Sequence, residues 1–222
     1  MQRQLIVTED GSHTLFVPEL DENYHSTHGA IQESQHVFIE SGLLFSTKQE
    51  VTILEIGFGT GLNALLSLIA GEKAAKHIQY IGIEKYPLRP EEYSVLNYGE
   101  LLSETGKKQL LQLHACAWES EQHISDQFIL QKLACDARLI NWETLPYFDL
   151  IYFDAFAPNK QSDLWNQELY RSIYNHANHD ALFVTYCAKG VVRRDLQAVG
   201  FKVERIPGPP GKMEMLRGIK FC

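Results

Sequence analysis

The 222-residue sequence has few of the features that mark secreted, membrane or metal-binding proteins. Its four cysteines form no C-x-x-C pair, which fits small buried side chains in a reducing compartment. His25, His28 and His36 are close in the chain, but no cysteine or carboxylate cluster completes a metal-ligand set. No apolar run approaches a membrane span, and the N-terminus shows no signal-peptide pattern. We therefore expect a cytoplasmic protein with no metal and no membrane partner.

The sequence also lacks internal repeats, low-complexity tracts and Pro/Ser-rich linkers, so nothing forces a second independent domain. Its hydrophobic content of 45%, with 22% charged residues, is ordinary for a globular protein. The predicted organisation is one globular unit. Residues 1–48 form a hairpin and helix that pack on a core, and residues 49–222 form the main domain.

An excess of positive charge is missing as well: the formal charge is −8, which argues against a uniformly basic nucleic-acid binder. The charge is unevenly spread, because residues 186–222 hold eight lysines and arginines against three acids, a net +5. The remaining residues therefore carry −13. This basic end could contact a polyanion, or it could be an ordinary solvated face.

The hydrophobic pattern changes character along the chain. Residues 4–20 alternate around an Asp10-Gly11 turn and predict a β-hairpin, and residues 30–45 have helical spacing. From Val51 onward, short continuous apolar runs predict buried strands. They begin near residues 51, 77, 128, 148 and 181, and a final strand pair covers 201–206 and 213–221.

Helices are predicted between several of these strands, over 64–70, from Pro90 to about 102, and over 190–199 with Gly200 ending the last. Residues 101–126 carry the weakest pattern. Strands that alternate with helices indicate an α/β fold with a mostly parallel sheet covered by helices on both faces. The predicted N-terminal hairpin and helix are a small addition to this Rossmann-like arrangement.

The stretch LEIGFGTGLN (54–63) lies where a strand passes into a helix. Gly57, Gly59 and Gly61 allow a tight turn and close approach of a ligand to the helix N-terminus. A dinucleotide fingerprint would need a glycine where Leu62 stands, so a pyrophosphate site is disfavoured. Glu55 would also repel a phosphate but would suit a cationic group.

Acids follow the next strands. Glu84 ends the second strand of the domain, 23 residues after Gly61, where a carboxylate can accept both hydroxyls of a ribose. Asp136 follows the third strand, where it could accept a hydrogen bond from an adenine amino group. Asp154 follows the fourth. Because parallel strands end at one edge of the sheet, these acids should meet there, and adenine and ribose without phosphate describe S-adenosylmethionine.

The motifs EIGFGTGLN, IGIEK and the acids at 136 and 154 resemble the class I, Rossmann-like methyltransferases. The resemblance narrows over four further stretches, which are NYHSTHGAIQESQHVFI (23–39), DAFAPNKQSDLW (154–165), GVVRRDLQAVGF (190–201) and GKMEMLRG (211–218). These look like the MnmD-type tRNA methyltransferases, which form the N-terminal half of MnmC proteins. The similarity runs from about Leu15 to Gly218.

The resemblance implies methyl transfer from S-adenosylmethionine to the aminomethyl group on a tRNA wobble uridine, giving 5-methylaminomethyl-(2-thio)uridine. In bifunctional relatives, a flavin-dependent half first removes a carboxymethyl group. At 222 residues we expect a stand-alone methyltransferase, coupled to separate enzymes that make the aminomethyl uridine.

The resemblance and the chemistry together suggest roles for the site residues. Asp154 would attract, orient and deprotonate the substrate amine, because a protonated alkylamine has no lone pair for attack. Phe156 would stack on the uracil or exclude water, with Trp165 as a second candidate against an ordinary packing role. We expect the cofactor to be held by Tyr24, Glu33, Glu55, Gly57, Gly59, Gly61, Asn63, Glu84, Asp136 and Asp154.

Basic residues are the candidates for tRNA phosphates, and they are Lys160, Lys189, Arg193, Arg194 and Lys212. The two arginines could instead pair with Asp195 or Glu204. In the final loop, IPGPPGK (206–212) departs from the more basic and aromatic pattern of the family.

Two other functions use the same features. An aminopropyltransferase of the spermidine synthase type shares the sheet and an acid that handles an amine, but it usually carries a G-G-G-D-G turn where this chain has GFGTG. A non-catalytic RNA-binding module could retain the fold. The presence of Glu84, Asp136 and Asp154 together argues against such a module.

Overall fold

The computed structural model describes residues 1–221, and Cys222 lies outside the described residues. Its centre is an eight-stranded sheet in the order β10-β11-β9-β8-β4-β5-β7-β6. The strands are β4 (Glu50–Ile56), β5 (His77–Ile83), β6 (Glu121–Ser125), β7 (Phe128–Leu133), β8 (Phe148–Phe153), β9 (Ala177–Thr185), β10 (Lys202–Pro207) and β11 (Glu214–Ile219). The five central strands pair in parallel, and β6, β10 and β11 add antiparallel pairs at the edges. The predicted mostly parallel α/β sheet is confirmed.

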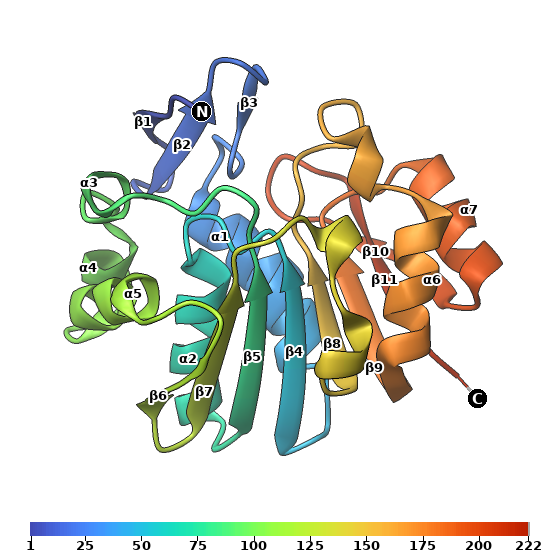
Figure 1. Ribbon diagram of the computed structural model, residues 1–222. Helices are drawn as coiled ribbons and strands as arrows, with labels where there is room; N and C mark the ends of the chain where they lie inside the picture. The colour runs from blue at the N-terminus through green and yellow to red at the C-terminus, as the bar shows by residue number, and fades with distance from the viewer. Residues whose placement is uncertain (222) are drawn as a thin grey trace.

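Helices cover both faces of this sheet (Figure 1). One face packs against α1 (Ala30–Ser34), η1 (Gln35–Leu43), α2 (Leu62–Lys73) and α5 (Gly106–Ala115), and the other against α6 (Gln167–His176) and α7 (Gly190–Val199). Along β4 the side chains alternate between the faces, since Ile53 belongs to the first apolar cluster and Leu54 to the second. Strands buried on both sides explain the unbroken apolar runs of the sequence.

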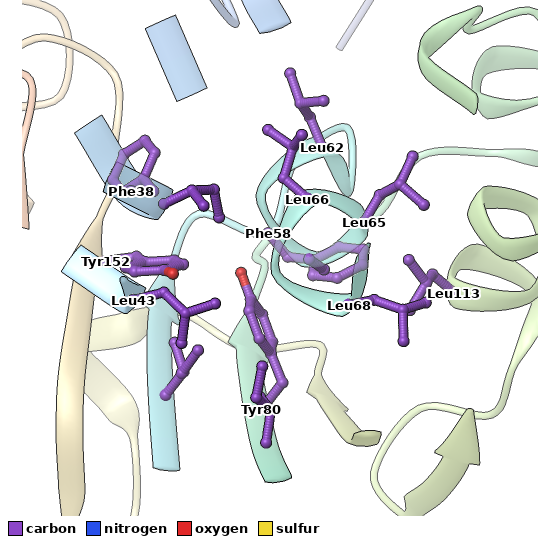
Figure 2. Close-up of a cluster of buried hydrophobic side chains, with 14 of the residues drawn as sticks. Phe38, Leu43, Phe58, Leu62, Leu65, Leu66, Leu68, Tyr80, Leu113 and Tyr152 are labelled. Carbon is purple, nitrogen blue, oxygen red and sulfur yellow. The ribbon is translucent and has the colours of Figure 1, made fainter. Parts of the chain in front are cut away.

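The cluster on the first face surrounds two buried tyrosines. Figure 2 shows Tyr80 of β5 and Tyr152 of β8 between Phe38 and Leu43 of η1 and the leucines of α2. Both tyrosines have no exposed surface, and their rings meet edge to face at 6.1 Å. Their hydroxyls therefore lie inside the core, below the end of the sheet that carries the glycine turn.

The N-terminal segment forms a small separate sheet, β1 (Gln4–Val7), β2 (His13–Val17) and β3 (Glu22–Asn23), beyond the ends toward which the central strands point (Figure 1). The β1–β2 pairing confirms the predicted hairpin. Arg3 ties it to the main domain, donating to Glu92 at 3.0 Å and to the Tyr24 hydroxyl at 2.9 Å. The small sheet is thereby fixed over one edge of the main sheet.

Several predicted elements differ in detail. The helix expected over 30–45 is α-helical only to Ser34 and continues as a π-helix, η1. The helix expected after Pro90 breaks into α3 (Pro90–Tyr93) and α4 (Tyr98–Leu102). The backbone of Gly99 in α4 passes so close to Gly106 in α5 that a side chain on either would clash, so α4 packs directly against α5.

Further elements had no counterpart in the prediction: α5, the edge strand β6, α6, and the short turns η2 (Ala137–Leu139), η3 (Trp142–Thr144) and η4 (Ser162–Leu164). Among residues 1–221, no helix is both long and apolar enough to cross a membrane. Cys116, Cys135 and Cys187 are free thiols, as the cysteine pattern predicts.

Candidate active site

A cavity of about 590 Å³ opens at the C-terminal ends of β4, β5, β7 and β8. From β4 the chain builds the sheet first through β5 and β7 on one side and then through β8 and β9 on the other, so β4 and β8 flank a topological switch point. Ligands of open α/β sheets bind at this place. The volume lies within the range of small-molecule sites.

Most residues predicted for the site come together here. Those that line the cavity are Tyr24, Glu33, Gly57, Gly59, Asn63, Glu84, Asp136, Asp154, Phe156, Lys160 and Lys212. Those that do not line it are Glu55, Gly61, Trp165, Lys189, Arg193 and Arg194.

The glycine turn is shaped by close contacts that exclude side chains. Gly57, Gly59 and Gly61 all have positive φ, at 95°, 49° and 71°. A Cβ on Gly57 would lie 2.5 Å from the carbonyl oxygen of Asp154, because the ends of β4 and β8 nearly touch. A Cβ on Gly59 would lie 3.1 Å from the Tyr24 ring. Gly61 lies behind the cavity wall and serves as the N-cap of α2.

Glu84 is held rigidly at the end of β5. One carboxylate oxygen accepts the backbone N–H of Gly59 at 2.9 Å, and the other accepts that of Tyr86 at 2.7 Å. Burial raises the pKa of Glu84, and the backbone donors partly offset the effect. Each oxygen keeps a second lone pair, so the carboxylate can still accept two hydroxyls on its cavity side.

Asp136 lies in a different electrostatic setting, surrounded by cations. Arg138 donates to it at 2.6 Å and Lys85 at 3.0 Å, and its side chain also caps η2. Hydrogen bonds from Arg138, against some desolvation, lower the pKa of Asp136 far below its usual range. Arg138 further pairs with Asp163 at 3.1 Å, which links this end of the cavity to the loop after β8.

Asp154 lies at the opposite end, where β8 leaves the sheet, and its N–H still bonds to Ile56 at 3.0 Å. The side-chain nitrogen of Asn63, in the first turn of α2, donates to Asp154 Oδ2 and to Glu55 Oε1, both at 2.8 Å. Burial, then the nearby Glu33, raises the pKa of Asp154 to about 7. A carboxyl with this pKa can change its protonation at neutral pH.

Glu55 does not reach the cavity surface, although a direct ligand contact was expected of it. The side chain is 0% exposed, and Asn63 lies between it and Asp154. Alternation along β4 turns Glu55 into the helix-covered face of the sheet, so any influence on a ligand passes through Asn63.

A second ion pair stands near Asp154. Glu33 of α1 accepts Lys212 Nζ at 2.5 Å and the backbone N–H of Ser26 at 2.8 Å. Lys212 comes from the loop between β10 and β11, and its ammonium lies 4.1 Å above the Tyr186 ring. Lys212, expected on an outer phosphate, thus points into the cavity.

Two aromatic side chains form a wall at this end. Tyr24 and Phe156 meet edge to face with ring centroids 5.0 Å apart. Arg3 donates to the Tyr24 hydroxyl, while burial raises the pKa of that hydroxyl to about 12, so the side chain stays neutral. Phe156 is half-buried, which leaves part of its ring free for a ligand.

Trp165 is placed beneath the loop and not on the cavity. It is 8% exposed, donates its indole N–H to the Phe156 carbonyl at 2.7 Å, and packs on Phe153. The indole gains more from burying its large apolar surface than from exposure, and its one donor is satisfied. This geometry assigns Trp165 to supporting Phe156.

The remaining basic candidates lie outside or at the rim. Lys160 pairs with Asp21 at 3.3 Å, and Lys189, before α7, reaches Asn159 at 3.2 Å. Among the described residues Arg193 and Arg194, both on α7, form no ion pair, and their expected partners Asp195 and Glu204 bond to Gln167 and Arg217. Lys160 also lines the cavity, and Lys189 contacts the 154–165 loop through Asn159.

Sequence reasoning missed three contributors: Lys85, Arg138 and Tyr186. Tyr186 directly follows β9, as the acids follow their strands, and this position was a usable signal. The histidines weighed as metal ligands have other partners, since His25 bonds to the Thr60 hydroxyl at 2.7 Å and His36 to the Pro207 carbonyl. Within residues 1–221 no group of three or more potential ligand side chains surrounds a metal position.

Comparison with known proteins adds independent information. The model of a family described as S-adenosyl-L-methionine-dependent methyltransferase matches residues 103–221. The chain is 30% identical, over 96% of its length, to the tRNA 5-methylaminomethyl-2-thiouridine biosynthesis bifunctional protein MnmC of Burkholderia thailandensis, and 31% identical to that of Burkholderia vietnamiensis. It spans about a third of the length of these relatives, 34% in each case.

Among solved structures, MNMC2 from Aquifex aeolicus matches with a TM-score of 0.78 and 26% identity, over 98% of this chain and 70% of that one. The family match covers more than half of the described chain, and it includes β8 and the loop that carries Asp154. The chain therefore belongs to the S-adenosyl-L-methionine-dependent methyltransferase family, and S-adenosylmethionine is its methyl donor.

Proposed function

We propose that this methyltransferase acts on a primary amine, the 5-aminomethyl group of a wobble uridine in tRNA. The proposal rests on the position and pKa of Asp154. This carboxyl, with a pKa of about 7, lies at the end of the cavity where β8 leaves the sheet, beside the aromatic wall of Tyr24 and Phe156. The MnmC relatives, named for 5-methylaminomethyl-2-thiouridine biosynthesis in tRNA, support the same substrate. Such a substrate would be met in the cytoplasm.

The residues of the cavity fit S-adenosylmethionine, which supplies a methyl group on a positively charged sulfur. Gly57 and Gly59 let the turn pass directly against Asp154 and Tyr24, where a Cβ would be crowded out, and Glu84 presents two fixed acceptors for ribose hydroxyls. We propose that Asp136 borders the adenine, sharing its carboxylate with Arg138. The end of the cavity that holds Asp154 and Glu33 is acidic, so it suits a sulfonium better than a phosphate.

The Glu33–Lys212 pair is complementary to an α-amino acid. Lys212 can bind a carboxylate and Glu33 an ammonium, and both line the cavity close to Asp154. We therefore assign the pair to the methionine part of the cofactor. Lys212, on this view, binds the cofactor and not the tRNA.

Asp154 and the aromatic wall would handle the amine together. An alkylammonium has a pKa near 10 in water, too high for efficient loss of a proton at neutral pH. Apolar surroundings from Ala155 and Phe156 lower the amine pKa, while burial raises that of Asp154, so the two values approach each other. Proton transfer from ammonium to carboxylate then becomes nearly balanced, and the free lone pair can attack the methyl group.

The rest of the substrate would be bound outside. Phe156 and Tyr24 offer ring surface for the uracil, and Lys160, Lys189, Arg193 and Arg194 are the proposed phosphate contacts. Changing one of these cations to alanine should weaken tRNA binding at low salt and reduce the slope of log affinity against log salt by about one. If a variant leaves the slope unchanged, the cation that it lacks makes no phosphate contact in the wild type.

The direct test uses the purified chain, S-adenosylmethionine and an anticodon stem-loop carrying 5-aminomethyluridine at the wobble position. We expect mass spectrometry to find one added methyl group on that nucleoside, with or without the 2-thio group. Stem-loops with unmodified uridine or 5-carboxymethylaminomethyluridine are the controls. Transfer to none of them, despite cofactor binding, would remove this substrate from consideration.

In cells, the proposed substrate already carries its aminomethyl group before methyl transfer. A chromosomal Asp154→Asn variant, which disables methyl transfer alone, should therefore leave 5-aminomethyl nucleosides in bulk tRNA, and expression of the wild-type chain should convert them. Wobble nucleosides that are identical in the two strains would contradict the proposal.

A further inference from the structure

Glu55 occupies a position where a negative charge is costly. It is fully buried on β4, on the same face of the strand as Ile53, opposite Gly82 of β5 and Tyr152 of β8. On this face of the sheet Ile53, Tyr80 and Tyr152 belong to the first apolar cluster, and the Tyr80 hydroxyl lies close to the Glu55 carboxyl. An ion in such an apolar setting needs several donors or a cation.

Glu55 has too few of these donors to hold a charge. Glu55 Oε1 accepts one hydrogen bond, from Asn63, and within residues 1–221 the buried Oε2 has no hydrogen-bond partner. No lysine or arginine of the described chain forms an ion pair with it. Burial, followed by the charge of Asp154, raises the pKa of Glu55 well above its usual value. The neutral acid avoids the cost of an isolated buried charge.

Asn63 links this acid to the reacting end of the cavity. Its side-chain NH₂ has two hydrogens, and the nitrogen lies 2.8 Å from Glu55 Oε1 and 2.8 Å from Asp154 Oδ2. The amide is 2% exposed and stands in the first turn of α2, so its position is fixed by the helix. Two carboxyl groups that share one donor repel each other strongly if both are ionised.

The two carboxyl groups differ in what faces them. Asp154 opens on the cavity, and the charged groups near it are the ion pair Glu33–Lys212, with the Tyr186 hydroxyl beyond. Glu55 faces Tyr80 and, farther off, Glu84. The single proton of the pair therefore belongs on Glu55, and the charge on Asp154.

We propose that Glu55 is a positioning residue: a protonated carboxylic acid that holds the Asn63 amide, so that Asp154 alone carries the negative charge that receives the substrate amine. The role rests on the proposed function, because it concerns how Asp154 meets an ammonium. A charged Glu55 would repel Asp154 and keep it protonated at neutral pH. A neutral Glu55 leaves Asp154 free to ionise, with its orientation fixed by Asn63.

The protonation state can be measured without any RNA. Infrared difference spectra between the wild-type chain and Glu55→Gln at pH 8 should show the carbonyl stretch of a protonated carboxylic acid in the wild type only. Glu50→Gln, in the same strand but at its exposed end, is the control and should leave the protonated-acid band in place. Loss of carboxylate bands in Glu55→Gln as well would overturn the proposal.

The positioning role is tested by the pH profile of methyl transfer to the aminomethyl stem-loop. Glu55→Leu removes the acceptor that anchors Asn63, which should move the acid limb of the profile upward by about half to one pH unit. Glu55→Gln, which keeps an acceptor and mimics the neutral acid, should return the limb to its wild-type position.

A downward move of one unit or more in Glu55→Gln would contradict the proposal, because it would mean that wild-type Glu55 is charged. If Glu55→Leu does not fold, the glutamine variant and the infrared spectra still decide the question. If no aminomethyl substrate is methylated, the proposed function fails, while the infrared result stands by itself.

Discussion

Each end of the cavity holds an aspartate that follows a parallel strand, and the pKa values of the two aspartates are shifted in opposite directions. Asp136, after β7, is bound by Arg138 and Lys85, whose side chains are 43% and 41% exposed, and its pKa is lowered. Asp154, after β8, is half-buried beside other carboxyl groups, and desolvation raises its pKa to about 7. One acid is a permanent anion suited to binding, and the other can exchange a proton. Position in the fold brings both to the site, while the neighbours decide their chemistry.

The largest expected effect comes from removing the proton acceptor. Asp154→Asn should slow methyl transfer roughly 10²–10⁴-fold in single-turnover experiments at saturating cofactor and stem-loop, since the amide cannot accept the ammonium proton. Asp126→Asn, in the β6–β7 turn at the opposite end of the sheet, is the matched control and should leave the rate unchanged. A wild-type rate in Asp154→Asn would contradict the assignment of Asp154 as the proton acceptor.

Glu84 comes next, as the proposed ribose-binding acid, whose two oxygens are both held by backbone N–H groups. Glu84→Ala should raise the Kd for S-adenosylmethionine roughly 10- to 100-fold, because charge-assisted hydrogen bonds to ribose and to the turn are lost together. Calorimetry with the purified chain measures this. An unchanged Kd would mean that the Glu84 carboxylate binds only the backbone of the turn and not the ribose.

The free energy of unfolding should change in opposite directions when the two aspartates are replaced by asparagine at neutral pH. The folded-state pKa of Asp154 lies above the ordinary 3.8, so folding binds the proton more tightly, and stability falls as pH rises from about 4 to about 7. Asp154→Asn should therefore be more stable than wild type above pH 7, by about 2–4 kcal/mol, and equal to it near pH 4. Denaturant unfolding at the two pH values measures the difference.

Asp136 has the reverse linkage. Its folded-state pKa is lowered, so its contribution is present above pH 4 and disappears as pH falls further. Because its partners are exposed and screened, Asp136→Asn should lose less than about 1 kcal/mol at pH 7. Equal signs for the two variants at pH 8 would contradict the assigned pKa directions.

The smallest effect belongs to Arg138. Arg138→Ala frees one side of Asp136 and cuts the link to Asp163, so the Kd for S-adenosylmethionine should change by no more than about fivefold, without an effect on the transfer step. Equilibrium binding and single-turnover rates report the two quantities separately. A large fall in the transfer rate would show that the two ends of the cavity are coupled.

Much of this arrangement followed from the sequence because parallel strands end at one edge. Glu84, Asp136 and Asp154 each follow a continuous apolar run, and that is enough to bring them together. The glycine turn was equally readable. The division of the helix after Pro90 and the π-helical η1 were not, and η1 packs against α2, β8 and β9, which are distant from it in the sequence.

The finer chemistry of the site also depends on tertiary neighbours. Nothing in the sequence near Glu55 shows that it is buried below Asn63, or that Trp165 supports Phe156 from beneath. The ion pair of Glu33 with Lys212 joins residues 179 positions apart. Local sequence patterns predicted which side chains lie at the edge of the sheet. Their hydrogen-bond and ion-pair partners depend on the tertiary fold.

The pH dependence of the single-turnover rate on the aminomethyl stem-loop tests the role of Asp154 most directly. If Asp154 receives the proton, the rate should rise about tenfold per pH unit below pH 7 and level off above it, as the carboxyl with a pKa of about 7 ionises. The Asp154→Asn variant should lose this limb. A wild-type rate that instead keeps rising tenfold per unit through pH 9 would mean that the amine loses its proton to solvent, and would contradict the assignment.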